Sequence, residues 1–169
     1  QILFAERQQR VAPARDDKVL VAWNGFMISA MARAYQVLGD ERYGHAAGEA
    51  VDFILEKMRD KTGLLHTYKD GRARVGAFQD DYAALVNGLL DLYEARFEPV
   101  RLRQACELAE EMVARFWDAD KGGFFYVQEG ADDVIVRSKN PFDNATPAGN
   151  SLGALALLLS CFCRRSAPA

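Results

Sequence analysis

Cysteine and histidine are scarce in this chain of 169 residues, which contains three cysteines and two histidines. Cys106, Cys161 and Cys163 are odd in number and lack the spacing of metal ligands. We therefore expect neither a disulfide framework nor a metal site. Structural thiols are typical of a reducing compartment, so we expect a cytoplasmic protein that carries no cofactor.

Long apolar runs, a strong net charge and phosphate-binding motifs are also missing. The apolar run at residues 152–159 is too short to span a bilayer, and no signal peptide opens the chain. The net charge is -3, and the basic residues are scattered among acids, which argues against a nucleic-acid partner. Neither a phosphate-binding glycine loop nor a G-x-S-x-G elbow occurs. We expect no membrane and no nucleic-acid binding.

The stretch from Asn140 to Leu159 holds a polar, turn-rich loop that runs directly into an apolar helix. Thr146 followed by Pro147 predicts a helix N-cap with proline in the first turn, and Ser151 offers a second candidate start. Such a loop is costly to keep ordered unless it binds or caps something. The stretch is therefore a candidate binding segment.

The same layout occurs earlier in the chain. Trp23-Asn24-Gly25 precedes a helix predicted over 26–38, which is apolar around nearly its whole circumference and is therefore expected to be buried on all sides. An amphipathic helix is predicted over 42–58. A hairpin over 63–71 follows, with its turn at Asp70-Gly71.

This unit then repeats. Asp80-Asp81-Tyr82 leads into an apolar helix that ends near residue 97, and an amphipathic helix covers 101–117. A second hairpin is predicted from Gly122, turning near Glu129-Gly130 and returning through 134–136. Tyr35 and Tyr93 occupy matching positions 58 residues apart. A third unit opens at residue 140.

Alternation between fully apolar and amphipathic helices predicts two concentric layers of helices. Common helical solenoids repeat at about 34 or 40–47 residues and alternate less strongly. We therefore predict an all-α fold, part of an α/α toroid with small β-hairpins between the helix pairs. It would form a single domain over 1–169, divided into an N-terminal helix and linker, two helix pairs with hairpins, and a third inner helix: 1–17, 18–79, 80–139 and 140–169. A partial ring exposes apolar inner-helix surface, which predicts either homo-oligomerisation or instability of the isolated chain.

In such a ring the inner helices run the same way, so polar residues at their N-termini should meet at one mouth. Carboxylates there can divide acid and base roles, aromatic rings can stack on sugars, and amides can bind hydroxyls. Helix N-termini also favour anions, so phosphorylated or carboxylated ligands stay open. The expected site combines three clusters and one hairpin: Asp16, Asp17, Trp23 and Asn24; Asp80, Asp81 and Tyr82; Asn144, Thr146, Asn150 and Ser151; His66 and Tyr68.

Asp81 is our candidate for acid–base chemistry, with Asp80 or Asp17 as its partner and His66 as the epimerase-type alternative. The ligand-binding candidates are Trp23, Asn24, Tyr82, Tyr68, Asn144, Thr146, Asn150 and Ser151. Structural roles stay open beside these. The paired aspartates, Asn24 and Ser151 suit helix caps, Trp23 suits a core, and His66 suits a surface hairpin.

Several motifs in order resemble the C-terminal half of the thioredoxin-domain-containing, spermatogenesis-associated family. They lie at 15–20, 22–30, 80–83, 110–118, 122–125 and 144–151. The resemblance implies the later part of a six-hairpin α/α toroid of the glycosidase and sugar-epimerase type, without the thioredoxin-like domain. The chain has no Cys-x-x-Cys, so the resemblance carries over no redox activity. It also supplies no catalytic residue, and Ala148 stands where many relatives are expected to have serine.

Two functions from different classes follow. The first is carbohydrate processing by a glycoside hydrolase or a sugar epimerase or isomerase, acting on a sugar-like ligand at the mouth. The second is a non-catalytic ligand-binding or scaffold module that accompanies a thioredoxin-like domain. Two free carboxylates roughly 5–10 Å apart across a cavity favour hydrolysis. Carboxylates wholly engaged with helix N-termini favour the scaffold.

Overall fold

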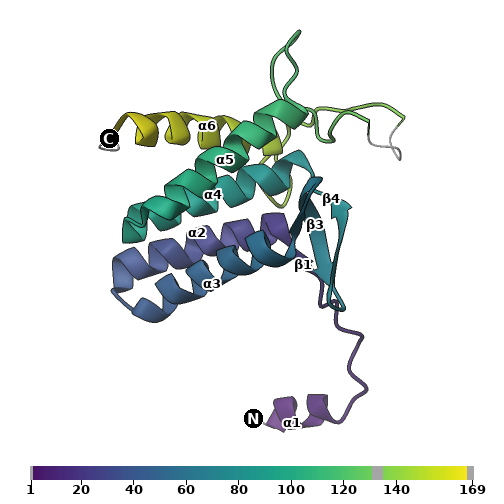
Figure 1. Ribbon diagram of the computed structural model, residues 1–169. Helices are drawn as coiled ribbons and strands as arrows, with labels where there is room; N and C mark the ends of the chain where they lie inside the picture. The colour runs from purple at the N-terminus through teal and green to yellow at the C-terminus, as the bar shows by residue number, and fades with distance from the viewer. Residues whose placement is uncertain (1, 131–134, 167–169) are drawn as a thin grey trace.

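Three inner helices form the centre of the computed structural model, which describes residues 2–130 and 135–166 (Figure 1). These helices are α2 (Val21–Leu38), α4 (Gln79–Arg96) and α6 (Gly149–Ser166). Helix α4 packs against both of the others and is buried at every position from 81 to 90. A helix that is apolar around its circumference is stable in this central position because neighbours cover each face.

Two amphipathic helices form the outer layer. Helix α3 (Glu41–Lys57) packs on α2, and α5 (Pro99–Phe116) packs on α4. Each buries a single apolar stripe and turns its charged side chains to solvent. Helices α4 and α5 both begin 58 residues after α2 and α3, so the predicted repeat is confirmed.

A small antiparallel sheet lies at the end of the molecule where the inner helices begin (Figure 1). Its central strand is β3 (Gly63–Lys69), which pairs with β4 (Arg72–Gly76) on one edge. Strands β1 (Val19–Leu20) and β2 (Arg59–Asp60) pair with successive parts of its other edge. The predicted hairpin is therefore present. Strand β1 leads directly into α2, which fixes the start of that helix beside the sheet.

The N-terminal helix α1 (Ile2–Gln8) buries none of its residues and stands apart from the helical body (Figure 1). The segment 11–18 that joins it to β1 has no regular structure and is exposed throughout. Both lie in the part of the chain for which an N-terminal helix and linker were predicted. Along the whole described part of the chain, no helix is long and apolar enough to cross a bilayer.

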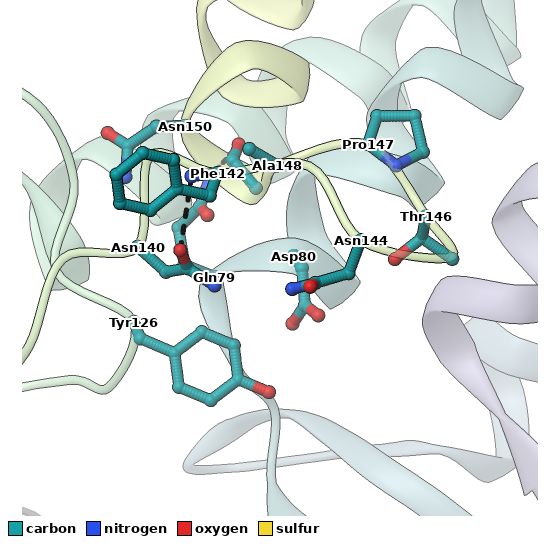
Figure 2. A pocket seen from close by; sticks show the side chains of 11 residues that line it. Gln79, Asp80, Tyr126, Asn140, Phe142, Asn144, Thr146, Pro147, Ala148 and Asn150 are labelled. Atoms are coloured by element: carbon teal, nitrogen blue, oxygen red, sulfur yellow. Dashed lines mark hydrogen bonds between the residues drawn. The ribbon is translucent and has the colours of Figure 1, made fainter.

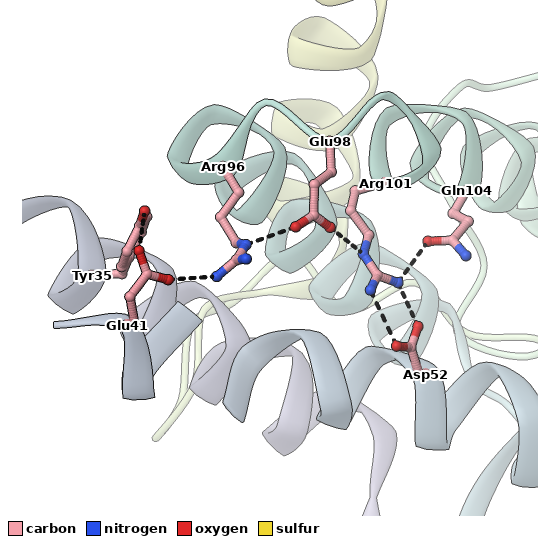
Figure 3. A network of polar contacts seen from close by, with 7 residues as sticks. All are labelled: Tyr35, Glu41, Asp52, Arg96, Glu98, Arg101 and Gln104. Atoms are coloured by element: carbon pink, nitrogen blue, oxygen red, sulfur yellow. Dashed lines mark hydrogen bonds and ion pairs between the residues drawn. The ribbon is translucent and has the colours of Figure 1, made fainter. Parts of the chain in front are cut away.

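An ionic network ties the two helix pairs together on their outer side (Figure 3). Arg96 of α4 lies between Glu41 and Glu98, at 3.3 and 2.7 Å. The buried Arg101 of α5 contacts Asp52 of α3 at 2.5 Å and Glu98 at 3.4 Å. Asp52 and Glu98 are partly exposed to solvent, and ion pairs of this kind contribute little to stability. We therefore expect the network to fix how the two helix pairs align rather than to stabilise them strongly.

The prediction of a second hairpin is wrong. The described residues after α5 contain an isolated bridge between Trp117 and Phe124 but no ladder of strands. Part of the predicted return strand falls at 131–134, outside the described residues. Instead, loop packing orders this segment, with Trp117 and Phe124 rings 5.2 Å apart and the Tyr126 N–H bonded to the Ser138 carbonyl.

Two predicted helix starts are also wrong. Helix α2 begins at Val21, so Trp23, Asn24 and Gly25 lie inside its first turns. Helix α6 begins at Gly149, so Thr146 and Pro147 belong to the preceding loop. Nor is α2 buried on all sides, because four of its large apolar side chains are exposed: Trp23, Met27, Val37 and Leu38.

Candidate active site at the inner-helix N-termini

Asp81 joins three elements at the mouth. Its side chain is completely buried, and one carboxylate oxygen accepts a hydrogen bond from the backbone N–H of Ala22 at 3.0 Å. The other oxygen accepts from the N–H of Phe78 at 2.9 Å and contacts Nδ1 of His66 at 2.8 Å. Asp81 thus caps the start of α4 and, across 59 residues of sequence, also the start of α2.

This contact orients the imidazole of His66 on strand β3. The hydrogen bond to Asp81 raises the pKa of His66 above its usual value, although partial burial opposes the change. When the ring is neutral, a proton on Nδ1 can donate to Asp81, and this leaves the lone pair of Nε2 as the free base. Asp81 therefore acts as a positioning group, because both of its oxygens are engaged.

The backbone opposite His66 is strained. In the register of β3 with β4, Leu65 faces Gly76 and Thr67 faces Arg74, which places Val75 opposite His66. Val75 has φ of 63°, a left-handed conformation that is a genuine outlier for a β-branched residue. Such strain costs about 1–3 kcal/mol and is concentrated at functional sites.

A cleft of about 200 Å³ opens between the starts of α4 and α6 (Figure 2). Helix α6 begins 70 residues after α4, later than the period of 58, and the additional loop forms one wall of this cleft. Figure 2 shows Asp80 and Asn144 reaching into the same space, beside the ring of Tyr126. The lining comprises Gln79, Asp80, Tyr126, Asn140, Phe142, Asn144, Thr146, Pro147, Ala148, Gly149 and Asn150.

Asp80 is the acidic side chain among the described residues that line this cleft. Burial and, after it, repulsion from the adjacent Asp81 carboxylate together raise the pKa of Asp80 to about 6, although the hydrogen bond from the Asp81 N–H and the nearby His66 partly oppose the shift. Its carboxylate accepts a local hydrogen bond from the Asp81 N–H at 3.1 Å. Within the described residues, no lysine or arginine forms an ion pair with it. Asp80 can therefore change its protonation state near neutral pH.

Stacked rings connect the cleft to His66. Phe78 stacks on Tyr126 with ring centroids 4.8 Å apart and meets the imidazole of His66 edge-on at 4.9 Å. Burial and, to a smaller extent, the nearby carboxylates of Asp80 and Asp81 together raise the pKa of Tyr126 to about 12. Tyr126 therefore stays protonated and presents a neutral hydroxyl and a ring face.

Two side-chain amides, the buried Gln79 and the half-buried Asn150, hold the walls of the cleft. Nε2 of Gln79 donates to the carbonyl of Gly149 at 2.9 Å, and a Cβ at Gly149 would collide with the Gln79 amide oxygen. Asn150 bonds both backbone groups of Phe124, accepting at 2.7 Å and donating at 2.9 Å. The predicted ligand-binding Asn150 is thus engaged with backbone. Gln79 was missed because a buried glutamine gives no periodic signal.

The other predicted site residues are placed away from the cleft or inside the core. Tyr82 is buried, its hydroxyl donates to Glu111 at 2.9 Å, and burial raises its pKa to about 12. Tyr68 packs edge-on against Phe53 of α3 at 5.1 Å. These two rings therefore face protein. Two of the predicted acids are exposed and form surface ion pairs, Asp16 with Lys18 and Asp17 with Lys69. Trp23 on α2 and Ser151 on α6 are exposed. The side chain of Asn24 donates a hydrogen bond to the Leu20 carbonyl.

The structure thus brings together Asp80, Asn144, Thr146 and Asn150 at the cleft, with His66 and Asp81 next to it. Sequence reasoning missed Tyr126, Asn140 and Phe142 as lining residues. Tyr126 could have been found, because it lies in the predicted second hairpin and that hairpin was expected beside the mouth. Among the described residues, no group of three or more histidine, cysteine or carboxylate side chains could hold a metal ion.

Comparison with known proteins gives the relatives of this chain. No protein-family model matches it. In an alignment of 167 residues that covers 92% of the chain, it is 36% identical to spermatogenesis-associated protein 20 of Homo sapiens. The chain is a relative of spermatogenesis-associated protein 20. An uncharacterized protein of Caenorhabditis elegans is 31% identical over 166 residues. The chain spans about a fifth of the length of spermatogenesis-associated protein 20, 21% for the human protein.

Solved structures identify the fold. A cellobiose 2-epimerase from Spirochaeta thermophila matches 85% of this chain with a TM-score of 0.62 and 20% identity, and the match covers 37% of the epimerase. A D-mannose isomerase matches 85% with a TM-score of 0.64 and 18% identity, over 38% of its own chain. These neighbours are α/α toroids. The chain therefore has the predicted fold, part of an α/α toroid.

Proposed function

We propose that the cleft binds a sugar and that this part of the protein catalyses proton transfer on it, in the manner of a sugar epimerase or isomerase. The observation that carries the proposal is Asp80, a carboxyl with a pKa of about 6 and no ion-pair partner among the described residues, inside a cleft lined by amides and aromatic rings. Asparagine side chains suit sugar hydroxyls, and aromatic rings such as Tyr126 suit the apolar face of a sugar ring. The structural neighbours named as sugar epimerases and isomerases support the same class.

Proton transfer fits the carboxylates better than hydrolysis does. Glycoside hydrolysis by the common routes needs two available carboxyl groups on either side of the scissile bond. Asp81 is engaged at both oxygens, so Asp80 remains as the available carboxyl of the pair. Epimerisation at the carbon next to a carbonyl needs one group that removes a proton and one that protonates the carbonyl oxygen.

Asp80 and His66 can supply these two roles. With a pKa near 6, ionised Asp80 can accept the proton from the carbon next to the sugar carbonyl. His66, whose pKa is raised by Asp81, can donate its proton to the carbonyl oxygen, and this forms a neutral enediol. Return of the proton from Asp80 to the former carbonyl carbon, with loss of the other hydroxyl proton to His66, gives the isomerised sugar and restores both groups. Return of the proton to its original carbon gives the epimer when the enediol has first turned its other face to Asp80, so both cycles are balanced.

The test is exchange of substrate hydrogen with solvent. The full chain is incubated in deuterated water with glucose, mannose and cellobiose, and deuterium at the carbon next to the carbonyl is followed by NMR. We expect exchange in the wild type and a loss of about 100-fold or more in Asp80→Asn, because general acid–base catalysis contributes that much. Asp17→Asn is the matched control and should keep the wild-type rate. Equal exchange in Asp80→Asn and the wild type would refute the assignment.

A scaffold or simple ligand-binding module is the second candidate function. It is favoured by the complete engagement of Asp81 with the N–H groups of Ala22 and Phe78, the arrangement expected of a structural carboxylate. In the same experiment, this candidate predicts sugar binding without exchange, or neither. Exchange therefore separates the two candidates, and binding measured in parallel by calorimetry shows whether a protein without exchange still holds a sugar.

We also propose that the chain self-associates through the exposed apolar face of α2, with a second copy as the partner. Trp23, Met27, Val37 and Leu38 expose 67, 55, 82 and 63% of their surfaces. Exposed apolar side chains grouped on one helix mark interaction surfaces. Sedimentation velocity should give a dimer or larger species, and Met27→Glu should shift it towards monomer. A wild-type monomer at the highest soluble concentration would contradict the proposal.

The free thiols agree with a reducing, cytoplasmic setting, which we retain as part of the proposal. Cys106 is buried and Cys161 is exposed, and both are unpaired. Exposed free thiols are typical of proteins that are not kept in an oxidising compartment.

A further inference from the structure

The charge of the cleft discriminates between classes of sugar. Among the described residues that line it, Asp80 is the one charged side chain, and the remainder are amides, hydroxyls, aromatic rings and small residues. An anionic sugar would therefore bring its phosphate or carboxylate close to Asp80 with no lysine or arginine in the lining to balance it. Unpaired like charges in a partly desolvated site oppose binding.

The start of α6 does not offset this charge. The N-terminus of a helix favours anions through its free N–H groups. Here the Asp143 carboxylate accepts from the N–H of Ala148 at 2.7 Å, immediately before the helix. An acid of the chain therefore already lies at this helix start and accepts from the N–H that precedes it, so an anionic ligand there would meet a second carboxylate.

The same lining suits a cation. The carboxylate of Asp80 has no ion-pair partner among the described lysines and arginines, and the aromatic rings of Tyr126 and Phe142 line the same cleft. A protonated amine gains from a carboxylate through a charge-assisted hydrogen bond and from an aromatic face through cation–π attraction. The Asn144 amide and the amide nitrogen of Asn140 line the same cleft and can bind hydroxyls, while the Asn140 amide oxygen accepts from the N–H of Phe142 at 3.1 Å.

We propose that the cleft selects amino sugars with a free, protonated amine over neutral sugars, and excludes sugar phosphates and uronic acids. The inference rests on the proposed function, since it assigns a substrate class to the same site. It differs from that function in making Asp80 a specificity-determining residue, which holds whether or not the bound sugar reacts.

The pH dependence has a defined sign. Asp80 is faced by Asp81 of its own helix, by His66 of β3 and by Tyr126 of the loop after α5. It is ionised above a pKa of about 6, and an amine on a sugar loses its proton near the α-amino range of about 8. Preference for the amine should therefore be largest between these values and fall on both sides. Positive charge on protonated His66 reinforces the fall on the acid side.

The experiment compares four sugars on one scaffold by calorimetry with the full chain: glucosamine, glucose, glucose 6-phosphate and glucuronate. We expect glucosamine to bind about 10-fold more tightly than glucose near pH 7, and neither anion to bind measurably. In Asp80→Asn, glucosamine and glucose should bind equally. The ratio of the two affinities in the wild type, followed from pH 5 to pH 9, gives a second readout that needs no variant.

Each outcome has a definite meaning. Equal binding of glucose and glucosamine by the wild type overturns the charge selection and leaves the proposed sugar site in place. Tighter binding of glucose 6-phosphate or glucuronate also overturns it and assigns the start of α6 as an anion site. If none of the four sugars binds, the inference and the proposed function fail together. A preference for glucosamine that persists in Asp80→Asn removes Asp80 from the proposal.

Discussion

Asp81→Asn is expected to lower the free energy of unfolding by about 3 kcal/mol, because removing one partner of a buried charged network leaves the others unpaired. The carboxylate is completely buried and receives hydrogen bonds from Ala22 and Phe78. The new amide nitrogen would face at least one of these donors instead of accepting from it. Urea unfolding followed by circular dichroism measures the loss, which is a large share of the 5–15 kcal/mol typical of a domain.

The loss should depend on pH through His66. Its folded-state pKa is raised above the usual value of 6.5, so the Asp81–His66 pair stabilises the fold fully below that value. The contribution is lost as the pH rises through the folded-state pKa. The difference between wild type and Asp81→Asn should therefore be greater at about pH 6 than at about pH 9. His66→Gln should abolish this pH dependence.

The exposed Asp60 offers a matched control, since it also accepts a backbone N–H, that of Thr62 at 2.7 Å. Asp60→Asn should unfold at nearly the same urea concentration as the wild type. If Asp81→Asn were equally harmless, Asp81 would not be the residue that joins α2, α4 and β3. It would then return as a candidate for chemistry.

The layered helices could be predicted because their cause lies in local sequence patterns. Apolar residues covering one stripe or a whole circumference indicate how many neighbours a helix needs, and the spacing of 58 residues between Tyr35 and Tyr93 gave the repeat. The Asp70-Gly71 turn was likewise readable from its dipeptide. These signals each act within about one helix or one hairpin.

The details of the mouth depend on contacts that local patterns do not contain. The start of α2 was misplaced because its capping group is Asp81, far away in the sequence. The start of α6 was misplaced because two side chains hold the backbone just after Pro147: Asp143 accepts from the N–H of Ala148, and Gln79 donates to the carbonyl of Gly149. The helix therefore begins after Pro147 rather than at it. Local rules for caps assume that a helix is capped by its own neighbours.

The division of roles between the paired aspartates was not readable for the same reason. Asp80 and Asp81 are consecutive, yet one borders a cleft and the other is wholly buried and hydrogen-bonded. Successive residues of a helix differ by about 100° in direction, so adjacent carboxylates meet different surroundings. The favoured candidate for chemistry therefore moved from Asp81 to its neighbour.

Gly25→Ala is expected to destabilise the fold by about 3 kcal/mol, since overpacking a tight helix contact costs 1–3 kcal/mol and sometimes more. A Cβ at Gly25 would lie 2.6 Å from the backbone carbonyl carbon of Ala84 in α4. Backbone cannot move aside as the end of a flexible side chain can. At the same crossing, a Cβ at Gly88 would lie 2.8 Å from the Gly25 carbonyl oxygen. The two glycines thus allow α2 and α4 to approach closely.

Gly48→Ala in α3 is the matched control, because its new Cβ would meet only Arg101 Nη2 at 3.6 Å. Alanine is the better helix former, so this variant should gain about 0.5 kcal/mol. Thermal and urea unfolding of both variants should therefore change in opposite directions. The larger effect should extend to the site, because separating α2 from α4 would stretch the bond between Ala22 and Asp81 and release His66. A Gly25→Ala protein as stable as the wild type would mean that the inner helices do not cross this closely.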